Sequence, residues 1–474
     1  MPLDKETMVK PVSADHLFPR FHVRPPLGYL NDPNGPLLLD GTFHLYYQYR
    51  HSTDHAAPVV WGHATSADLA HWVHQRPAIV PHPVLGDRDG CWSGNTVVDD
   101  AGRVRAFYSG KRNGHPYQSV LCAVSGDGGA SFGDPRQVVD DPDPSEGIIT
   151  FRDPFVWRDQ DRWLMVVGAG DASLIASARL YRSDDLDRWQ HLGVLAAQRR
   201  TVDAEQDTGE MWECPQVIQL AGHPVVLVGA WTRQHGTSKV YSVAGGSTTG
   251  RAGPLTIAPL DDGPDFYAAS VLRDSRDGTL VWGWATEARD HTWCVEDGWS
   301  GILTLPRVVR PRSGDRLALA PVPALALLRD GEPVTVGPQG QDGLAAQLEF
   351  EATAAPDVPL RVRLRFGDHE RLDVVLDRAA GAVRIDRSRA SLDERAIGGT
   401  IEIAEAFADD ETAGVRAFLD GSILEVFTSS GRVATVRYYP TAPPPYRIEI
   451  TGGPPGSVRL WRLSADQALA TDRL

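Results

Sequence analysis

Hydrophobic and polar residues alternate along most of this chain, with the two-residue period of half-buried β-strands. The alternating segments begin near residue 37 and recur to the end, and they are rich in Val, Tyr, Trp and Phe and bounded by Gly, Asp and Pro. Segments 42–49, 104–109 and 224–230 are examples. Helical patterns are scarce, with one candidate at 322–329. We therefore predict an all-β protein.

A short motif recurs in the first half of the chain at intervals of about 60 residues. Ser66-Ala-Asp-Leu-Ala-His-Trp72 closely matches Ser183-Asp-Asp-Leu-Asp-Arg-Trp189, and Ser125-Gly-Asp-Gly-Gly-Ala-Ser-Phe132 is a looser copy between them. Each copy follows a predicted strand, and its aspartate is expected in a turn with an aromatic anchor a few residues on.

A second series of short segments, several of them containing an acidic residue before proline, recurs at nearly the same interval of 60 residues. Repeats that each hold three or four short strands are typical of propeller blades, which bring matching residues to one central axis. Five units predict a five-bladed β-propeller over roughly 16–310. The members of the series are Asp32-Pro33, Ser93-Gly94, Asp153-Pro154, Glu213-Cys-Pro215 and Phe266-Tyr267.

The 60-residue interval is lost near residue 310, although the β pattern continues. Several prolines mark a connector there, and eight strand-like segments follow in the last part of the chain, which fits a β-sandwich. The predicted organisation is an N-terminal extension (1–15), the propeller (16–310), a linker (311–335) and a β-sandwich (336–474).

Composition narrows the possible functions. The chain of 474 residues has 46 glycines and 35 prolines, as expected for many short strands joined by turns, and a net charge of −15. An acidic chain repels phosphate backbones, so we expect no nucleic-acid binding. No basic amphipathic stretch or long apolar segment points to a membrane.

The cysteines and the N-terminal sequence indicate in which cellular compartment the protein works. None of the four cysteines forms a Cys-x-x-Cys pair, which argues against a zinc site and against a disulfide framework. The first residues lack the apolar core of a secretory signal. We therefore expect a cytoplasmic protein with reduced thiols.

Three acidic residues, Asp32, Asp153 and Glu213, stand in register with the interval, and each is followed by proline directly or one residue later. The proline after Asp32 favours extended backbone for that aspartate, and Asn34-Gly35 then predicts a turn. Taken alone, each of the two Asp-Pro segments is most simply a structural turn, and a lone Trp-Glu pair is uninformative. Three acids in register favour a shared catalytic site.

Paired carboxyl groups are what glycoside hydrolysis commonly requires, one as nucleophile or base and one as acid. A third acid can favour the oxocarbenium-like transition state electrostatically. We expect no cofactor and no metal: the Gly168–Ser173 loop lacks the third glycine and helix of a dinucleotide site, the histidines lack metal-type spacing, and the acidic stretch Asp140–Pro144 is most simply a solvated loop.

Asn31-Asp-Pro-Asn-Gly35, Phe151-Arg-Asp-Pro154 and Trp212-Glu-Cys-Pro215 resemble the three signature segments of glycoside hydrolase family 32, the family of invertases, levanases, inulinases and sucrose-6-phosphate hydrolases. The resemblance covers nearly the whole chain. Further matching segments are Trp61–Trp72, Trp92–Gly94, Asp265–Ala268, Trp282–Trp284, Gly301–Arg307, Pro321–Arg329, Leu424–Phe427 and Arg437–Pro440.

The resemblance implies a five-bladed propeller with a β-sandwich, and release of terminal β-fructofuranosyl units with retention of configuration. It implies Asp32 as nucleophile, Glu213 as general acid/base and Asp153 as transition-state stabiliser. The residues implied at the fructosyl ring are Asn31, Gln48, Trp61, Ser93, Arg152, Tyr267 and Trp284, with Trp92 as a wall.

We expect a β-fructofuranosidase acting on sucrose or short fructo-oligosaccharides through a fructosyl-enzyme, with its two carboxyl groups about 5–5.5 Å apart. Sucrose 6-phosphate, inulin and levan remain alternative substrates. An inverting hydrolase of arabinose or xylose polymers would separate the carboxyl groups by roughly 6.5–9.5 Å. A non-catalytic carbohydrate-binding propeller is a further alternative, although it would be free to lose an acid and all three are present.

Two departures from the family pattern lie near the expected pocket. Tyr29-Leu30 stands where the family usually has Trp-Met, and Asn95 follows Ser93-Gly94 where the family usually has serine. Neither removes a catalytic acid. Both leave the leaving-group preference, and the balance of hydrolysis and fructosyl transfer, open.

Overall fold

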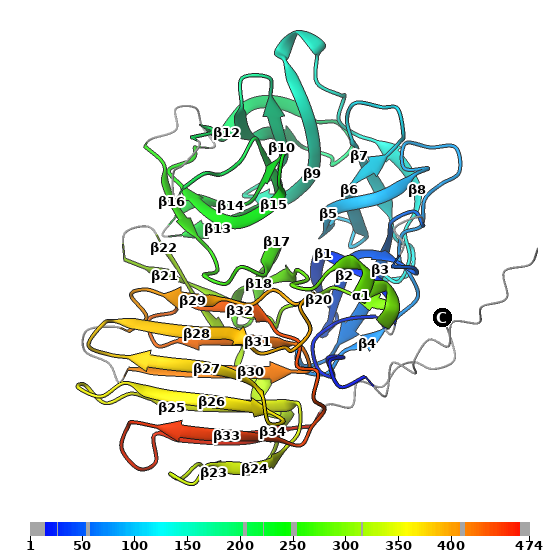
Figure 1. Cartoon of the computed structure of the whole chain (residues 1–474). Helices are drawn as coiled ribbons and strands as arrows, with labels where there is room; N and C mark the ends of the chain where they lie inside the picture. Colours follow the sequence, from blue (N-terminus) through cyan, green and yellow to red (C-terminus); the bar gives the residue numbers. More distant parts are fainter. Residues whose placement is uncertain are drawn as a thin grey trace, which may run out of the picture.

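The structure is a computed structural model, and Figure 1 shows its two parts, an upper group of sheets around a common centre and a lower pair of stacked sheets. Among the described residues almost every element is a β-strand, as predicted, and the α-helix α1 (His291–Asp297) is short. The described residues are 15–25, 27–53, 57–201, 206–220, 222–247, 254–313, 316–407 and 413–464.

The upper part is a β-propeller. Each innermost strand contacts the innermost strand of the next sheet, and the last of them returns to contact the first, so the ring is closed (Figure 1). The number of blades stays a prediction. The inner strands are β1 (Gly28–Leu39), β5 (Gly90–Val98), β9 (Ile148–Asp159), β13 (Met211–Leu220) and β17 (Phe266–Ser275).

The remaining propeller strands pair outward from these inner strands in antiparallel order, and the short β19 (Trp299–Ser300) pairs in parallel with β1. They are β2 (Thr42–Arg50), β3 (Val60–Ser66), β4 (Val73–His74), β6 (Val104–Lys111), β7 (Ser119–Val124), β8 (Gly133–Gln137), β10 (Arg162–Asp171), β11 (Ile175–Ser183), β12 (Gln190–Arg199), β14 (His223–Thr232), β15 (Gly236–Ala244), β16 (Thr256–Pro259), β18 (Gly278–Ala285), β20 (Ile302–Leu303), β21 (Arg307–Arg312) and β22 (Arg316–Pro321).

The repeated serine–aspartate motif forms the same turn in two sheets, which confirms the prediction. Ser66 Oγ accepts from Leu69 N at 2.8 Å, and Asp68 Oδ1 accepts from two backbone N–H groups further on. Ser183 Oγ accepts from Leu186 N at the same distance. The side chains thus satisfy backbone donors that the end of a strand leaves unpaired.

All five inner strands contain a β-bulge at the position of the repeated segments. The pairing register shifts between Leu30 and Pro33, and shifts at the matching place in β5, β9, β13 and β17. A bulge re-aims the side chains of an inner strand, which places them toward a common site. In β1, β9 and β13 the bulge coincides with an Asp-Pro or Cys-Pro pair, whereas β5 and β17 have no proline there.

The predicted turn at Asn34-Gly35 is wrong. Strand β1 continues through both residues, with a second register shift between Asn34 and Leu37. Gly35 is required there because β5 approaches closely: a Cβ on Gly35 would lie 2.8 Å from Thr96 N, and its φ is +42°. The glycine therefore serves close packing between two inner strands.

The lower part is a β-sandwich of two six-stranded sheets with a shared apolar core. Strand β26 shows the alternating burial expected of such a sheet. One sheet runs β23 (Arg329–Thr335), β34 (Val458–Leu463), β25 (Gln347–Thr353), β30 (Gly414–Asp420), β31 (Ile423–Thr428) and β32 (Val433–Arg437), and the other runs β24 (Gln341–Leu344), β33 (Tyr446–Thr451), β26 (Leu360–Phe366), β27 (Glu370–Asp377), β28 (Ala382–Arg389) and β29 (Thr400–Ile403).

The chain passes between the two parts through short ordered elements. Strand β22 pairs with β21 in the propeller, a 3-10 helix spans Pro323–Leu328, and β23 pairs with β34 in the sandwich. The predicted domain boundaries stay a prediction. No helix among the described ranges is long and apolar enough to span a membrane.

Buried charges join the sandwich to the propeller. Glu425 of β31 has no exposed surface and accepts from Arg307 Nη2 at 2.7 Å. The ring of His22 lies between Glu425 Oε1 (3.1 Å from Nε2) and Asp420 Oδ2 (2.9 Å from Nδ1). Desolvation alone lowers the pKa of His22, but the two carboxylates outweigh it and raise the pKa.

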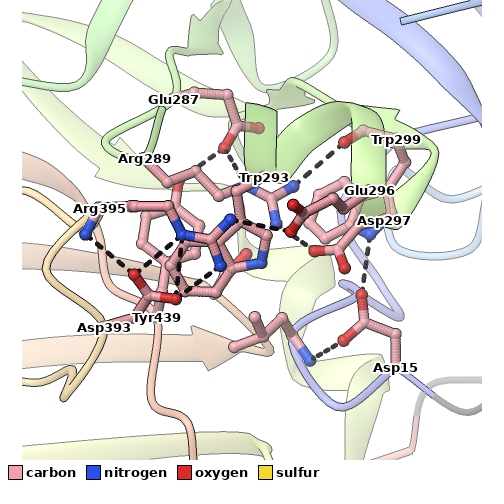
Figure 2. A network of polar contacts seen from close by, with 12 residues as sticks. Asp15, Glu287, Arg289, Trp293, Glu296, Asp297, Trp299, Asp393, Arg395 and Tyr439 are labelled. Atoms are coloured by element: carbon pink, nitrogen blue, oxygen red, sulfur yellow. Dashed lines mark hydrogen bonds and ion pairs between the residues drawn. The ribbon is translucent and has the colours of Figure 1, made fainter. Parts of the chain in front are cut away.

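A second group of contacts surrounds α1 (Figure 2). Tyr439 of the sandwich donates to Glu287 Oε2 at 2.7 Å, and Arg289 Nε donates to the same oxygen at 3.0 Å. Arg395 of the sandwich donates to Glu296 of α1 at 2.8 Å. The segment that follows β18 is therefore fixed from the sandwich side.

Candidate active site

The three predicted acids lie together where the bulged ends of β1, β9 and β13 meet. Asp32 and Asp153 are bridged by Cys214, whose Sγ lies 3.4 Å from Asp32 Oδ2 and 3.7 Å from Asp153 Oδ2. Arg152 connects Asp153 to Glu213, with Nε 3.9 Å from Asp153 Oδ2 and Nη2 2.6 Å from Glu213 Oε1. Residues about 60 positions apart in sequence therefore form one cluster.

Asp32 is held by several donors. Asn31 Nδ2 donates to Oδ1 at 3.0 Å, Ser93 Oγ donates to Oδ2 at 2.6 Å, and Gln48 Nε2 approaches Oδ2 at 3.1 Å. Gln48 also links to Asn31 and Ser93, so the four side chains form one network across β1, β2 and β5. A carboxylate with both oxygens accepting is fixed in orientation.

Asp153 is the most enclosed of the three acids. Its backbone N–H donates to Ser109 Oγ at 2.7 Å, and its Oδ2 accepts from Cys214 N at 3.0 Å. Its φ is +65°, so the extended geometry expected for an aspartate before proline does not hold here. A left-handed conformation in a non-glycine residue persists only where the surroundings enforce it, as these hydrogen bonds do.

Glu213 faces the cluster from β13 and is partly exposed. Arg152 donates to Oε1 from both Nε (3.1 Å) and Nη2 (2.6 Å), and Tyr267 Oη donates to Oε2 at 2.8 Å. Arg152 is itself held by Gln118 Oε1 at 3.3 Å. Each oxygen of Glu213 therefore has its own donor, one charged and one neutral.

Burial and mutual repulsion set the charges of the cluster. Burial raises the pKa of Asp32 and so does the charge of Glu213, whereas the hydrogen bonds from Ser93 and Asn31 lower it. Burial raises the pKa of Asp153 to about 7, with Arg152 opposing and Glu213 adding to the shift. Burial lowers the pKa of Arg152, but the two carboxylates outweigh it and the pKa is raised, so the guanidinium stays charged.

Two half-buried tryptophans are strand neighbours of cluster residues, Trp92 next to Ser93 on β5 and Trp284 opposite Tyr267 on β18. Trp92 is half-buried, with the Lys111 ammonium 5.4 Å from its ring centroid. Trp284 is half-buried and meets the Tyr29 ring edge-to-face at 6.1 Å. Such faces suit the apolar surface of a sugar ring.

Trp61 does not join the acid cluster. It is fully buried, and its indole N–H donates to the backbone oxygen of Trp92 at 2.9 Å. It packs behind Trp92 rather than facing the carboxylates. Apart from the three tryptophans, the predicted site residues lie in the cluster. Trp92 adjoins Ser93 along β5, and Trp284 pairs with Tyr267 across the sheet.

Three residues of the cluster were not predicted. Ser109 lies on β6 and Gln118 directly precedes β7, both outside the repeated segments, so no spacing marks them. Ser109 holds Asp153, and Gln118 holds Arg152. Cys214 lies inside the Glu213 segment, and its position between two acids is visible only once the blades are assembled.

The departure at Asn95 has a structural explanation. Its side chain is buried and pairs with the backbone of Val156, donating to O and accepting from N, both at 2.8 Å. Asn34 and Gln216 likewise accept from Gly94 N and Val271 N of the following inner strand. These amides join neighbouring blades behind the acids.

The arrangement suits acid–base and nucleophilic chemistry at an acetal. One carboxylate, Asp32, is oriented by neutral donors, and another, Glu213, is oriented by a cation and a phenol. Among the described residues no group of His, Cys, Asp and Glu side chains could hold a metal ion.

Family models match almost the whole chain. The model "Glycosyl hydrolases family 32 N-terminal domain" matches residues 22–321, and "Glycosyl hydrolases family 32 C terminal" matches 328–453. These spans correspond to the propeller and the sandwich. The three acids lie in the first span.

Curated relatives are similar over most of their length. The chain is 31% identical to a sucrose-6-phosphate hydrolase of Escherichia coli over 89% of each chain. It is 31% identical to a raffinose invertase of Escherichia coli over 90% of each, and 30% identical to a sucrose-6-phosphate hydrolase of Bacillus subtilis over 94% of this chain and 93% of that one.

Solved structures share the fold. A β-fructofuranosidase of Bombyx mori superposes with a TM-score of 0.78 at 26% identity, covering 95% of this chain and 94% of the other. A sucrose-6-phosphate hydrolase of Lactobacillus gasseri superposes with a TM-score of 0.80 at 23% identity, covering 97% and 96%. The second likeness concerns the fold alone.

Proposed function

Because the chain belongs to glycosyl hydrolase family 32, we propose that this glycoside hydrolase is a retaining β-fructofuranosidase. It releases terminal β-D-fructofuranosyl units from sucrose or short fructo-oligosaccharides. The observation that carries the proposal is the pairing of Asp32, held by neutral donors, with Glu213, held by Arg152 and Tyr267.

In this proposal the reaction has two steps. Glu213 protonates the glycosidic oxygen while Asp32 attacks the anomeric carbon of fructose, which gives a fructosyl-enzyme and frees the leaving sugar. Glu213 then takes a proton from water, and the resulting hydroxide releases fructose from Asp32. The hydrogen bond from Ser93 keeps the attacking oxygen of Asp32 oriented.

Asp153 and Arg152 have supporting roles. Asp153 contacts the same Cys214 thiol as Asp32 and, when ionised, stabilises positive charge on the sugar ring in the transition state. Because burial raises its pKa to about 7, its ionisation depends on the nearby Arg152 cation. Asn31, Gln48 and Tyr267 are proposed to contact the fructosyl hydroxyls as well.

The proposal is tested by product analysis on sucrose, sucrose 6-phosphate, 1-kestose, inulin and levan. We expect free fructose from sucrose and 1-kestose, and an initial product of retained configuration. The Glu213→Gln variant should lose at least about a hundredfold in kcat. An enzyme that releases no fructose from any of the five, or that inverts configuration, would contradict the proposal.

A phosphorylated leaving group is a second candidate, and Arg50 favours it. The Arg50 guanidinium lies 5.5 Å from the Tyr29 ring centroid, and its Nε is buried without a hydrogen-bond partner. Burial lowers its pKa, and the nearby charge of Asp32 opposes this. A half-buried cation beside the site is suited to an anionic group on the substrate.

Kinetics separate the two candidates. If the substrate is phosphorylated, kcat/KM for sucrose 6-phosphate exceeds that for sucrose, and Arg50→Gln lowers the former at least about tenfold while changing the latter little. Arg182→Gln, at an exposed pair with Asp184, is the matched control. Equal effects of Arg50→Gln on both substrates would contradict phosphate recognition by Arg50.

We also infer that the enzyme works in the cytoplasm. The four cysteines are buried and free, which suits a reducing compartment. Localisation of the tagged full-length protein tests this.

A further inference from the structure

Two residues of the sandwich hold Asp265, a carboxylate of the propeller at the edge of the active site. Arg387 of β28 donates from Nη1 to Asp265 Oδ2 at 2.5 Å, and the backbone N–H of Arg437, at the end of β32, donates to the same oxygen at 2.8 Å. Arg387 Nη1 also donates to Arg437 O at 2.6 Å. All three residues are buried, so solvent does not weaken these contacts.

Asp265 directly precedes β17, the inner strand that carries Tyr267. Tyr267 pairs across the sheet with Trp284, and Tyr267 Oη donates to Glu213 Oε2 at 2.8 Å. The far side of the same strand pair is held too, because Arg437 Nη1 donates to Ala285 O at 3.2 Å. Hydrogen bonds from the sandwich therefore hold both β17 and β18 at the end where Tyr267 and Trp284 lie.

Few ladder pairs fix the start of β17 at this end, although β20 pairs with the neighbouring β18 there. The register between β17 and β18 shifts between Tyr267 and Ser270, and Ala268 has a φ of +48°. A bulge interrupts the ladder that would otherwise fix the position of Tyr267. Only the two pairs Phe266–Ala285 and Tyr267–Trp284 stand between the bulge and Asp265.

Glu287 connects the sandwich to β1 by a second set of hydrogen bonds. It accepts from Arg437 Nη1 at 3.2 Å, from Tyr439 Oη at 2.7 Å (Figure 2) and from Gly301 N at 2.7 Å. Gly301 is pressed against Leu30, since a Cβ on it would lie 1.8 Å from Leu30 O. Leu30 is two residues from Asp32.

We propose that Arg387 and Asp265 are positioning residues for the acid/base group. Arg387 holds Asp265, Asp265 fixes the start of β17, and the Tyr267 hydroxyl is thereby kept in place to donate to Glu213. The sandwich thus completes the active site of the propeller. This inference rests on the proposed function, because it takes Glu213 as the acid/base.

Arg387→Gln and Arg387→Lys are the test variants, compared in kcat and KM on sucrose. Arg387 contacts Asp265 through a single nitrogen, which lysine can replace. We expect Arg387→Gln to lower kcat about tenfold with KM changed less than about threefold, and Arg387→Lys to recover most of the loss. The matched control is Arg363→Gln, which breaks a pair with Asp373 inside the same sheet and should leave kcat unchanged.

A double-mutant cycle separates positioning from plain stabilisation. If Arg387 acts through Tyr267, Arg387→Gln should add less than about a twofold loss of kcat in the Tyr267→Phe background. If Arg387→Gln lowers kcat by the same factor in the Tyr267→Phe background as in the wild type, the proposal is overturned. Wild-type kcat in a folded Arg387→Gln enzyme would overturn it as well.

A substitute variant and the activity of the wild-type enzyme cover two remaining outcomes. If Arg387→Gln does not fold, Asp265→Asn, which retains the shape of the side chain, is put through the same cycle with the same expectations. Failure of the proposed function is recognised separately, because the wild-type enzyme would then release no fructose. Normal wild-type activity with an additive cycle overturns the positioning role alone.

Discussion

Ser93 donates a hydrogen bond of 2.6 Å to Oδ2 of Asp32, from an inner strand of the neighbouring sheet. This bond lowers the pKa of Asp32 against the effect of burial, which raises it. The nucleophile works only when ionised. Ser93 is therefore placed to keep Asp32 active as the pH falls.

Removing the Ser93 hydroxyl should narrow the active pH range from the acid side. In Ser93→Ala the protonated form of Asp32 is relatively more stable, so the pKa of Asp32 rises and the acid limb of kcat/KM moves to higher pH. We expect the loss of kcat/KM at pH 5 to exceed that at pH 7 at least about threefold. Ser125→Ala, in a remote turn, is the control. An acid limb that does not move would contradict the assignment of Asp32.

Tyr267→Phe should lower kcat more than it raises KM. The variant removes the donor to Glu213 Oε2 but keeps the ring and its packing. We expect a loss of about ten- to a hundredfold in kcat for sucrose, and a smaller loss for an aryl fructoside whose leaving group needs little protonation. The ratio of kcat for the two substrates measures this. Equal losses on both would argue against a link to acid catalysis.

Asn95→Ala should affect stability rather than substrate preference. The side chain pairs with both backbone groups of Val156, and both would be left buried without a partner. We expect a cost of about 2 kcal/mol or more in the free energy of unfolding, measured in denaturant, with KM for sucrose little changed. A changed ratio of hydrolysis to fructosyl transfer would instead restore a functional role for this departure from the family.

His22→Gln should weaken the contact between the two parts at acidic and neutral pH. Because the pKa of His22 is raised in the folded protein, its protonation stabilises the fold fully below the unfolded pKa of about 6.5. That contribution is lost as the pH rises through the folded value. The melting temperature of the wild type should thus fall toward that of His22→Gln at alkaline pH. A difference between the two that is independent of pH would contradict a charged His22.

The sequence carried enough information to place the three acids together, because the 60-residue interval reports the repeating sheet and a proline stands at each of the three bulges that carry the acids. The sequence pattern could not identify supporting residues that lie outside the 60-residue interval. Ser109 supports Asp153 from β6, and Arg437 supports Asp265 from a position 172 residues away. Contacts of this kind depend on how separate sheets pack, and no local pattern records them.

Packing overturned one local expectation and set one backbone conformation that was not predicted. Asn34-Gly35 has the sequence of a turn, yet close approach of Thr96 makes the glycine part of a bulged strand. The expectation of extended backbone was made for Asp32 alone, and Asp153 adopts a φ of +65° because Ser109 and Cys214 hold its backbone and side chain. Tertiary contacts decided both positions.

The most direct test of the account is the rate of fructose release from sucrose by Asp32→Ala, measured beside the wild type on protein whose folding has been checked by circular dichroism. If Asp32 is the nucleophile, the variant loses at least about ten-thousandfold in kcat. Hydrolysis of sucrose and short fructans at a rate near that of the wild type would contradict the central claim.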